Sequence, residues 1–388
     1  MTIMFLVRSL DHGGAERQMI LLAKGLRARG HDIIVALFYG GWPDEQELRD
    51  AGVRVVHLEK HSRWDLFSFA TRLIRLVRKE RPSILHGYHG TPNLMSLVPK
   101  PFCPGTKIVW GLRCANMDWH HYDWAVAPLA KLTVWLSRWA DAHIANSKAG
   151  VTHHIAMGYP ARKLICIPNG IDTDRFAPDP TSRIFVRREW GIGDDERLVG
   201  LIARLDPMKG HRLFLDAAAR LAKLNRHVKF VCVGDGPVLY RDELQQHART
   251  LGLEHHLLWA GIRTDMPAVY NALDLVVSSS SGEGLSNALS EAMACGIPCV
   301  ATDVGDSAWL VGSTGAMVPP NDPEALAQAM QRTLSGPRPD AAMIRRRVSD
   351  HLSAETLITT TEKTLYAIVA GDVPAQPLFT RASFGAPQ

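Results

Sequence analysis

The chain has 388 residues, of which 46% are hydrophobic and 21% are charged. This balance is typical of a folded globular protein, excludes a disordered or fibrous chain, and at this length predicts two domains of ordinary size. The formal net charge of +5 is uneven, because residues 1–175 hold 23 Lys and Arg against 15 Asp and Glu.

The basic first half predicts a partner that carries negative charge, such as a phosphate-bearing substrate or an anionic membrane surface. No recognisable nucleic-acid motif accompanies it, so we expect no nucleic-acid partner. No run approaches the roughly 18–20 apolar residues of a membrane-spanning helix. Six scattered cysteines without a CxxC pair predict neither a zinc site nor a disulfide framework, and the cytoplasm is the expected compartment.

The chain opens with a short apolar run, Thr2–Val7, which predicts a first strand rather than a signal peptide. A glycine loop, DHGGAE, follows and contains Gly14, and residues 15–27 form an amphipathic helix. A strand, a Gly-Gly loop and a helix can offer backbone N–H groups to an anion, although Gly-Gly also simply makes a tight turn.

Strands are expected near residues 33–38, 53–58, 83–88 and 107–112, with helices between them. This alternation predicts a parallel sheet with helices on both faces. The helix over residues 64–79 carries Leu66, Phe67, Ala70, Leu73, Ile74 and Val77 on one face and Arg72, Arg75 and Lys79 on another. It is interpreted as a core helix with a solvated basic face, or as a peripheral contact with an anionic membrane.

Polar side chains follow two of these strands. His86 and His89 end the strand at 83–88, where a histidine can act in catalysis or cap the next helix. The next strand ends in WGLRCAN, which supplies Arg113 and Asn116. Further candidates in that loop are His120 and His121. Tryptophans surround the loop and are interpreted mainly as packing residues.

Residues 164–176 run into the sequence NGIDTDRF, which contains Asp172 and Asp174 two positions apart. This spacing matches a metal-binding D-x-D pattern. In an Asn-Gly turn it is interpreted as turn chemistry, and no metal site is predicted.

A strand at 198–203 precedes RLDPMKGH, in which Arg204 and Lys209 flank a proline turn just before a helix. An arginine fork, a lysine and a helix N-terminus can together neutralise a diphosphate, although two surface cations near a turn would show the same spacing. The next strand ends in GDGP at Gly234, and GIRTDMP follows another strand and contains Arg263.

The stretch from Leu275 to Gly305 is interpreted as strand, loop, helix and strand. Glu283 lies in its loop, Ser286 is the expected helix cap, and Glu291 lies on the helix that Gly296 closes. Ligands sit beyond the carboxyl ends of strands in a doubly wound sheet, so both glutamates are placed to meet one.

This stretch resembles the E-x7-E signature of retaining glycosyltransferases of the GT-B fold, in the large family 4 group. The loop GGAER is similar to the one that faces the donor diphosphate and the acceptor in that family, and Arg204 with Lys209 resembles its R-x4-K diphosphate clamp. The resemblance covers residues 1–370 and is strongest over 200–319. It implies an α/β GT-B fold in which two Rossmann-like domains face each other across a cleft.

The resemblance implies the following domain boundaries. Residues 1–170 form an acceptor-side domain, 171–195 a linker, 196–352 a nucleotide-sugar-binding domain, and 353–370 a closing helix that packs back toward the first domain. Residues 371–388, rich in Pro, Gly and Ala, are expected to be disordered.

The implied reaction moves a hexosyl group from a nucleotide-diphospho-sugar to an acceptor hydroxyl with retention of configuration, without a metal or other cofactor. Arg204, Lys209 and the backbone at Gly14 are expected to stabilise the leaving diphosphate. The resemblance implies that Glu283 binds hydroxyls of the donor sugar and that Glu291 binds the ribose hydroxyls. The remaining expected ligand contacts are Leu285, Ser286 and Asn287 for the sugar and diphosphate, and Gly234 and Arg263 for the nucleotide.

Many relatives carry a histidine where this chain has Arg113, in a W-x-L-R-x-x-N form that resembles a bacterial polysaccharide-assembly branch. Arg113 is therefore expected to contact the donor or the acceptor, with His89 and Asn116 on the acceptor side. The implied partners are a UDP- or GDP-linked sugar and a saccharide or polyprenyl-diphosphate-linked acceptor. The expected location is the cytoplasm, with peripheral contact to the anionic inner-membrane surface.

Other enzymes and a binding protein remain as alternatives. An epimerase or a phosphorylase can share the fold. An epimerase would need acid and base residues that face the sugar. A phosphorylase would need a pyridoxal-binding lysine and a longer chain. A dehydrogenase would need G-x-G-x-x-G, which is missing. A non-catalytic nucleotide-sugar-binding protein would not need Arg204, Lys209, Glu283 and Glu291 together.

Overall fold

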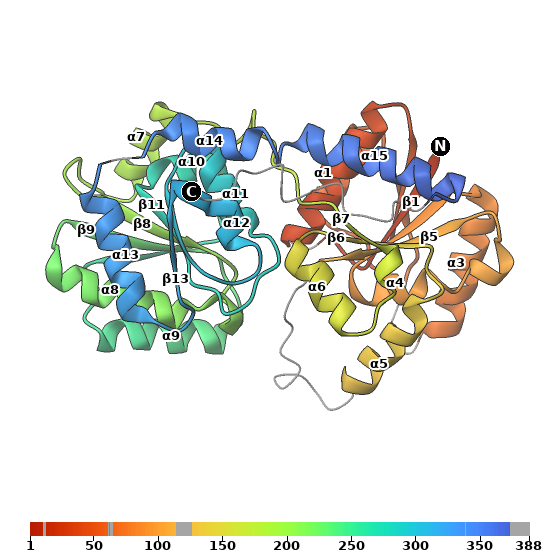
Figure 1. Ribbon diagram of the computed structural model, residues 1–388, viewed down its shortest axis with the longest axis horizontal. Helices are drawn as coiled ribbons and strands as arrows, with labels where there is room; N and C mark the ends of the chain where they lie inside the picture. Colours follow the sequence, from red (N-terminus) through yellow and green to blue (C-terminus); the bar gives the residue numbers. More distant parts are fainter. Residues whose placement is uncertain (11–12, 61, 63–64, 114–125, 338, 373–388) are drawn as a thin grey trace. The chain divides into compact units, whose positions relative to one another are not determined.

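The computed structural model describes residues 1–10, 13–60, 62, 65–113, 126–337 and 339–372 (Figure 1). They form two compact units. Unit 1 contains Met1–Gly170 and the helix that begins at Ala354, and unit 2 contains Ile171–Ser353. The expected disorder of residues 371–388 falls almost wholly outside the described residues.

Unit 1 is built on a parallel sheet in the order β3-β2-β1-β4-β5-β6-β7 among the described residues. Its strands are β1 (Thr2–Val7), β2 (Asp32–Leu37), β3 (Arg54–His57), β4 (Ile84–Tyr88), β5 (Lys107–Leu112), β6 (Ala142–Ala145) and β7 (Leu164–Cys166). Its α-helices are α1 (Gly14–Ala28), α2 (Asp44–Asp50), α3 (Leu66–Glu80), α4 (Gly90–Met95), α5 (Val126–Ser137), α6 (Lys148–Ala156) and α15 (Ala354–Ala370), and its 3-10 turns are η1 (Lys100–Phe102) and η3 (Ala161–Lys163).

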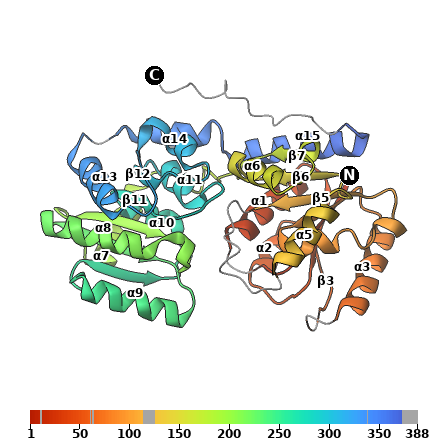
Figure 2. The same cartoon turned by 60° about the horizontal axis from the view of Figure 1, so that its bottom comes forward.

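Successive residues of a strand point to opposite faces, and unit 1 buries both faces. Ile3, Phe5 and Val7 of β1 pack in the cluster that contains α1, α2 and α15. Met4 and Leu6 pack in the opposite cluster, against α3 and neighbouring helices. Figure 2 shows these helices on both sides of the sheet. The predicted doubly wound parallel sheet is therefore confirmed.

The C-terminal helix α15 completes the core of unit 1. Leu357, Ile358 and Leu365 join the cluster that α1 forms on the sheet. At the rim, Arg29 donates to Glu362 at 2.6 Å, and His31 lies 2.7 Å from the other oxygen of the same carboxylate. A segment more than 320 residues away in sequence thus belongs to this unit.

Unit 2 has a parallel sheet in the order β10-β9-β8-β11-β12-β13 among the described residues. Its strands are β8 (Arg197–Ile202), β9 (Val228–Val233), β10 (Leu257–Gly261), β11 (Leu275–Ser278), β12 (Cys299–Thr302) and β13 (Ala316–Val318). Its α-helices are α7 (Pro180–Glu189), α8 (His211–Leu224), α9 (Val238–Thr250), α10 (Met266–Ala272), α11 (Asn287–Ala294), α12 (Ser307–Val311), α13 (Pro323–Ser335) and α14 (Ala341–Ser349), and its 3-10 turns are η4 (Pro207–Lys209) and η5 (Gly312–Thr314).

Two apolar clusters cover the two faces of this sheet. One packs α7, α10, α11, α12 and α14 against it, and the other packs α8, α9 and α13. The segment 171–195, expected to be a linker, lies in unit 2 and contains α7, which packs against α10.

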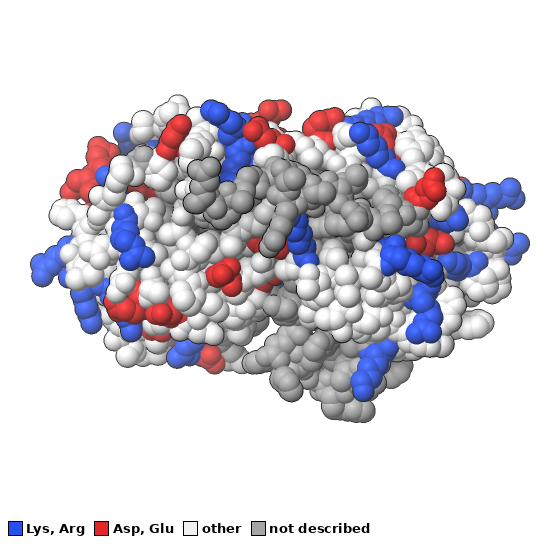
Figure 3. All heavy atoms as spheres, in the orientation of Figure 1, with Lys and Arg blue, Asp and Glu red and all other residues white. Residues whose placement is uncertain are grey.

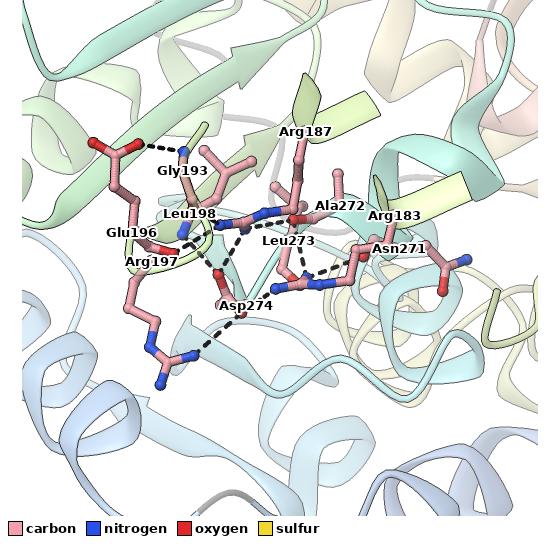
Figure 4. A network of polar contacts seen from close by, with 10 residues as sticks. All are labelled: Arg183, Arg187, Gly193, Glu196, Arg197, Leu198, Asn271, Ala272, Leu273 and Asp274. Carbon is pink, nitrogen blue, oxygen red and sulfur yellow. Dashed lines mark hydrogen bonds and ion pairs between the residues drawn. The ribbon is translucent and has the colours of Figure 1, made fainter. Parts of the chain in front are cut away.

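A buried carboxylate holds α7 on the sheet (Figure 4). Asp274, just before β11, is 7% exposed and accepts hydrogen bonds from Arg183 at 2.7 Å, Arg187 at 3.1 Å and the backbone N–H of Leu198 at 2.8 Å. Arg187 also donates to the carbonyl oxygens of Gly193 and Glu196. Because a charge removed from water must be paired, these contacts explain how two arginines of α7 face the interior.

The buried side of α3 differs from the expected one. The stripe that packs on the sheet runs through Phe69, Leu73 and Val77, whereas Leu66 and Phe67 are 52% and 88% exposed. The expected face was therefore wrong at Leu66 and Phe67 and right at Leu73 and Val77. The helix begins at Leu66 rather than at residue 64. The face that contains Phe67 and the face that contains Phe69 are both apolar at helical spacing, so the sequence alone did not distinguish them.

Candidate functional site

Each sheet reverses its strand order at one place, and that place defines where a ligand would bind. In unit 2 the reversal lies between β8 and β11, which pair directly. Loops that leave adjacent strands in opposite directions open a crevice beyond their carboxyl ends. The loop after β8 carries Arg204 and Lys209, and the loop after β11 carries Glu283.

Hydrogen bonds join these two loops. The N–H of Ser281 donates to the carbonyl oxygen of Met208 at 2.8 Å, and the hydroxyl of Ser279 donates to the carbonyl of Gly210 at 2.9 Å. Gly210 has φ of +67°, and a Cβ there would lie 1.9 Å from the carbonyl oxygen of Ser279. Glycine is therefore required for the contact between the loops.

The ion pair of Lys209 and Glu283 lies at the centre of this edge. The Nζ of Lys209 is 2.7 Å from the Oε1 of Glu283, and the two side chains are 23% and 12% exposed. The hydroxyl of Ser280 donates to the same oxygen at 2.8 Å. A cation and an anion are thus held side by side at a position that a ligand could reach, with their orientation fixed by hydrogen bonds.

Glycines shape the loop that carries Glu283. The N–H of Asp306 donates to the carbonyl of Gly284 at 2.9 Å. At Gly305, where φ is +59°, a Cβ would lie 2.2 Å from the carbonyl oxygen of Glu283 and 2.6 Å from that of Gly284. The backbone that follows β12 therefore supports the Glu283 loop at a distance that excludes a side chain.

Helix α11 begins directly after this loop, as the sequence predicts. Ser286 is the N-cap and accepts a hydrogen bond from the N–H of Leu289 at 3.4 Å, and Asn287 is the first helical residue. The side chain of Leu285 packs into the core, so a ligand at this edge would meet its backbone. An anion beyond the helix N-terminus would face the positive end of the helix dipole.

Glu291 lies on α11 and is held by Tyr270 of α10, whose hydroxyl donates to its Oε2 at 2.8 Å. Tyr270 is fully buried, and burial together with the charge of Glu291 raises the pKa of its phenol well above the usual range. Tyr270 therefore stays a donor at physiological pH, and it fixes the orientation of the carboxylate.

The remaining predicted residues of unit 2 are Arg204, Arg263 and Gly234, and they differ in exposure and in their hydrogen-bond partners. Arg204 is 71% exposed and pairs with Asp206 at 2.9 Å. Arg263 is engaged by two carboxylates, Glu189 at 2.5 Å and Asp265 at 2.7 Å. Gly234 directly follows β9 and has φ of +133°. A Cβ there would lie 2.1 Å from the carbonyl oxygen of Ala203, which directly follows β8, so only glycine allows this close approach.

The order of the unit 1 sheet reverses between β1 and β4, which pair directly. The loop after β1 leads to Gly14, the first residue of α1, and Gly13 before it has no side chain to cap the helix. The loop after β4 begins with His89, which is exposed and has φ of +68°. His86 is fully buried, and burial lowers its pKa to about 3, so it stays neutral in the interior.

Arg113 follows β5 at the same edge of unit 1. Its guanidinium lies 4.3 Å from the ring centroid of Tyr88, a cation–π geometry, and its Nη1 donates to the Oδ1 of Asn169 at 3.1 Å. Among the described residues its Nε has no hydrogen-bond partner. Asn116, His120 and His121 lie outside the described residues.

The Asp172 and Asp174 pair forms a turn. The Oδ1 of Asp172 accepts from the N–H groups of Asp174 at 3.2 Å and Arg175 at 3.0 Å, which confirms the interpretation as turn chemistry. Within the described residues, no group of three or more His, Cys, Asp or Glu side chains is arranged to hold a metal ion.

Sequence reasoning did not single out four residues that hold the predicted ones: Ser280, Tyr270, Tyr88 and Asn169. Ser280 lies in a run of four serines, residues 278–281, at the end of β11. Tyr270 lies on a short helix that the sequence analysis did not assign. Tyr88 and Asn169 do lie at a strand end and in an Asn-Gly turn, positions where polar side chains face a ligand edge, and that placement was the available signal.

Two family models match the chain in succession. "Glycosyltransferase Family 4" matches residues 12–175, and "Glycosyl transferases group 1" matches residues 196–336. The first falls in unit 1 apart from its last residues, and the second in unit 2. Together they include the edges of both sheets described above.

Curated relatives and solved structures agree with these models. A GDP-mannose-dependent alpha-(1-6)-phosphatidylinositol monomannoside mannosyltransferase of Mycolicibacterium smegmatis is 32% identical over 59% of this chain and 62% of its own length. The lipopolysaccharide core biosynthesis mannosyltransferase LpsB of Rhizobium meliloti is 35% identical over 42% of this chain and 48% of its own length. The chain thus spans about half to six tenths of the length of these curated relatives.

The crystal structure of Anabaena Alr3699/HepE in complex with UDP-glucose superposes with a TM-score of 0.84 at 26% identity, over 95% of this chain and 100% of that one. The chain belongs to the family 4, group 1 glycosyltransferases and has their GT-B fold.

Proposed function

We propose that the protein is a retaining glycosyltransferase that moves a hexosyl group from a nucleotide-diphospho-sugar to the hydroxyl of an acceptor, without a metal. The observation that carries this proposal is the ion pair of Lys209 and Glu283, 2.7 Å apart at the carboxyl edge of β8 and β11. Family membership supports the reaction class, and the arrangement at this edge supports the roles of individual residues.

The chemical demand of the reaction is the departure of a diphosphate that gains negative charge. Lys209 lies where it can meet that charge, and Arg204, mostly exposed two residues before its partner Asp206, can swing toward it. The N-terminal end of α11 would add a positive dipole end, and the backbone at Gly14 of unit 1 is proposed as a further diphosphate contact. Ser286 and Asn287 begin α11 and would meet the diphosphate and the sugar. Fixed positive groups of this kind remove the need for a divalent cation.

Glu283 would accept hydrogen bonds from the hydroxyls of the donor sugar and offset positive character at its ring. Glu291, oriented by Tyr270, would accept from the ribose hydroxyls. The backbone at Gly234 would contact the base. Arg263 would hold the base-side loop in place through Glu189 and Asp265.

Three residues of unit 1 are proposed on the acceptor side. Arg113 is oriented by Tyr88 and Asn169, and its buried Nε has no hydrogen-bond partner among the described residues. Its guanidinium is proposed to bind an anionic or hydroxyl group. His89 follows β4 at the same edge, and Asn116, three residues after Arg113 in the sequence, lies outside the described residues.

The donor is proposed to be a UDP- or GDP-sugar. The structure of HepE contains UDP-glucose, and the mycobacterial relative uses GDP-mannose by its name. The acceptor is proposed to be a saccharide or a polyprenyl-diphosphate-linked saccharide in cell-surface glycan assembly. A relative from Escherichia coli, 30% identical over 44% of this chain, is named for a diphosphoundecaprenol-linked acceptor. Work at the cytoplasmic face of an anionic membrane fits such an acceptor.

The test is transfer of the hexosyl group from each candidate sugar donor to a polyprenyl-diphosphate-linked saccharide by the purified protein, read as acceptor-dependent release of the nucleoside diphosphate. Lys209→Ala and Glu283→Gln are the variants. Each variant is expected to lower kcat/KM by about 10²–10³, because each removes charge stabilisation that develops in the transition state. Lys223→Ala, which removes an exposed lysine of α8 away from the edge, is the matched control.

Turnover of Lys209→Ala within a few fold of the wild-type protein would remove its proposed role. Activity abolished by EDTA and restored by Mn²⁺ would contradict the metal-independent mechanism. Inversion at the anomeric carbon, read by NMR of the product, would contradict retention.

A further inference from the structure

An exposed stripe of aromatic and basic residues covers the last turns of α5 in unit 1 and the turn that follows this helix. Leu132, Trp135 and Trp139 are 46%, 50% and 41% exposed. Lys131 and Arg138 are exposed as well. Lys131, Leu132 and Trp135 lie on the last turns of α5, which ends at Ser137, and Arg138 and Trp139 lie in the turn that follows. We call this stripe, together with Phe102, the aromatic–basic face.

The stripe is held in a fixed arrangement. The rings of Trp135 and Trp139 meet edge to face with centroids 4.4 Å apart, and the guanidinium of Arg138 lies within 6 Å of both. A cation–π contact keeps the charge beside the rings while both remain open to solvent.

Two lysines from neighbouring segments hold the turn that follows α5. Lys100 donates to the carbonyl oxygen of Trp139, and Lys163 donates to those of Arg138 at 2.7 Å and Ala140 at 2.6 Å. Lys100 belongs to η1, which ends at Phe102, 56% exposed. The aromatic–basic face therefore includes a second segment, η1, which Lys100 joins to the turn after α5.

The charge around the face is strongly positive. Lys131 and Arg138 lie on it, and Lys100, Arg162 and Lys163 surround it. The one acidic side chain that contacts these residues within the described chain is Asp141, which pairs with Lys100 at 3.1 Å. In Figure 3, Lys and Arg side chains gather over the side of unit 1 where Figure 1 draws α3 and α5.

This combination fits one kind of partner. Tryptophan rings prefer the boundary between hydrocarbon and water, and adjacent cations are drawn to anionic headgroups. Leu132 and Phe102 add apolar surface without hydrogen-bonding groups, which favours lipid over a saccharide. No helix of the described chain is long and apolar enough to cross a bilayer. We propose that the aromatic–basic face binds the surface of an anionic membrane.

The face lies at the edge of the sheet opposite the proposed catalytic residues. Lys100–Phe102 precede β5, Arg138 and Trp139 precede β6, and Lys163 precedes β7, so all lie at the amino ends of these strands. Arg113 and His89 lie at the carboxyl ends. Unit 1 can therefore rest on a membrane without covering its acceptor-side residues.

This proposal deepens the proposed function, on which it rests for the lipid-linked acceptor, and it assigns the membrane contact to α5 rather than to the outer face of α3. Vesicle binding needs neither donor nor turnover. A failure of binding therefore leaves the transferase reaction standing, and a failure of turnover leaves the membrane contact standing.

The experiment is co-sedimentation of the full chain with vesicles of phosphatidylethanolamine and phosphatidylglycerol, and with vesicles of phosphatidylcholine alone. The protein is expected to pellet with the anionic vesicles only, and less at high salt. Trp135→Ala with Trp139→Ala is expected to lower the partition coefficient by at least roughly tenfold. Arg138→Glu is expected to lower it by roughly tenfold through charge alone.

The matched controls lie on α7 of unit 2, where Ile184 and Phe185 are 63% and 70% exposed and Arg188 is exposed. Ile184→Ala with Phe185→Ala, and Arg188→Glu, are expected to bind as the wild-type protein does. Melting temperatures of all variants near that of the wild type show that they fold. If the tryptophan variant failed to fold, Arg138→Glu, which alters a solvent-exposed charge, would decide.

Three results would overturn the proposal. The wild-type protein could stay in the supernatant with anionic vesicles. The face variants could bind as well as the α7 controls. The protein could also form a dimer, seen by light scattering, that the tryptophan variant dissociates, which would assign the face to a second copy of the chain.

Discussion

Glu283 accepts hydrogen bonds from Lys209 and Ser280 through one oxygen, so its charge has a fixed position before a ligand arrives. A diphosphate that takes the ammonium of Lys209 has to compete with this carboxylate, and the carboxylate is then released to the sugar hydroxyls. Preorganised charges lower the reorganisation that the reaction requires. The ion pair thus links departure of the leaving group to binding of the sugar.

Gly305 gives the sharpest residue-scale prediction. Gly305→Ala would place a Cβ 2.2 Å from the carbonyl oxygen of Glu283, so the loop must move, and a displacement of about 1 Å at a catalytic group can cost 10²-fold in rate. We expect kcat/KM to fall by roughly that factor, measured by nucleotide release.

Gly252→Ala is the matched control, because Gly252 has φ of +72° and a Cβ added there would meet no atom within 4 Å. Both variants should lose about 1 kcal/mol of stability from the positive φ. Equal kcat/KM in the two variants would show that the contact between Gly305 and the Glu283 loop does not contribute to activity.

At the scale of elements, Asp274 is the residue on which the position of α7 depends. Asp274→Asn leaves Arg187, which is 6% exposed, without its anion, and breaking a buried pair in this way costs about 3–5 kcal/mol. We expect the unfolding transition of unit 2 to shift to lower denaturant by a corresponding amount.

Asp216→Asn is the control for Asp274. Asp216 pairs with His247 and its side chain is 34% exposed, so its loss should cost less than about 1 kcal/mol. A loss for Asp274→Asn no larger than for Asp216→Asn would mean that apolar packing alone holds α7.

Glu45 of α2 predicts a pH dependence of unit 1. Burial would raise its pKa, but N–H groups of Trp42 and Gly41 together with His57 and Arg49 outweigh burial and lower the pKa to about 2. Because the folded pKa lies below the ordinary value near 4.5, the stabilisation is present above that value and is lost as pH falls toward 2.

The measurement is chemical unfolding of wild type and Glu45→Gln between pH 7 and pH 3. At pH 7 the variant should be less stable by about 1–3 kcal/mol, and the gap should narrow toward pH 3. Glu47→Gln, which breaks the exposed pair with Lys24, should show little effect at either pH. A stability difference between wild type and Glu45→Gln that stays constant with pH would contradict the charge-based account, because it would mean that the substitution acts through packing instead.

Elements with strong local signals were predictable from the sequence. Helix α11 has its cap at Ser286 and ends before Gly296, where φ is +75°, and both signals lie in the residues themselves. The register of α3 was not predictable, because Phe67 and Phe69 each complete an apolar stripe and only tertiary packing selects Phe69. Helix α7 was not predicted, because the side that faces the protein interior carries arginines paired with Asp274 in place of a continuous apolar stripe.

The candidate site divides in the same way. Lys209 and Glu283 were predictable from a family pattern, and their contact follows from the pairing of β8 with β11. The contact of Tyr270 with Glu291 was not predictable, since it joins two helices 21 residues apart without a shared pattern. Partner residues of this kind depend on packing, which spacing along one element cannot show.

For the whole molecule, both units place their polar groups by one rule. Each is a parallel sheet whose strand order reverses once, at β1 and β4 in unit 1 and at β8 and β11 in unit 2. Glycine loops and helix N-termini follow these strands in both units. The proposed chemistry thus follows from topology first and from side chains second.

The central claim is that the edge at Lys209 and Glu283 binds a nucleotide-sugar. The most direct test is a thermal-shift panel of UDP, GDP, ADP and their sugars, with and without EDTA, on the wild-type protein and Lys209→Ala. Binding to the folded state raises Tm by mass action. We predict that one nucleotide raises the Tm of the wild-type protein regardless of EDTA and that Lys209→Ala loses most of the shift. A panel without any shift, or an equal shift in the variant, would contradict the account.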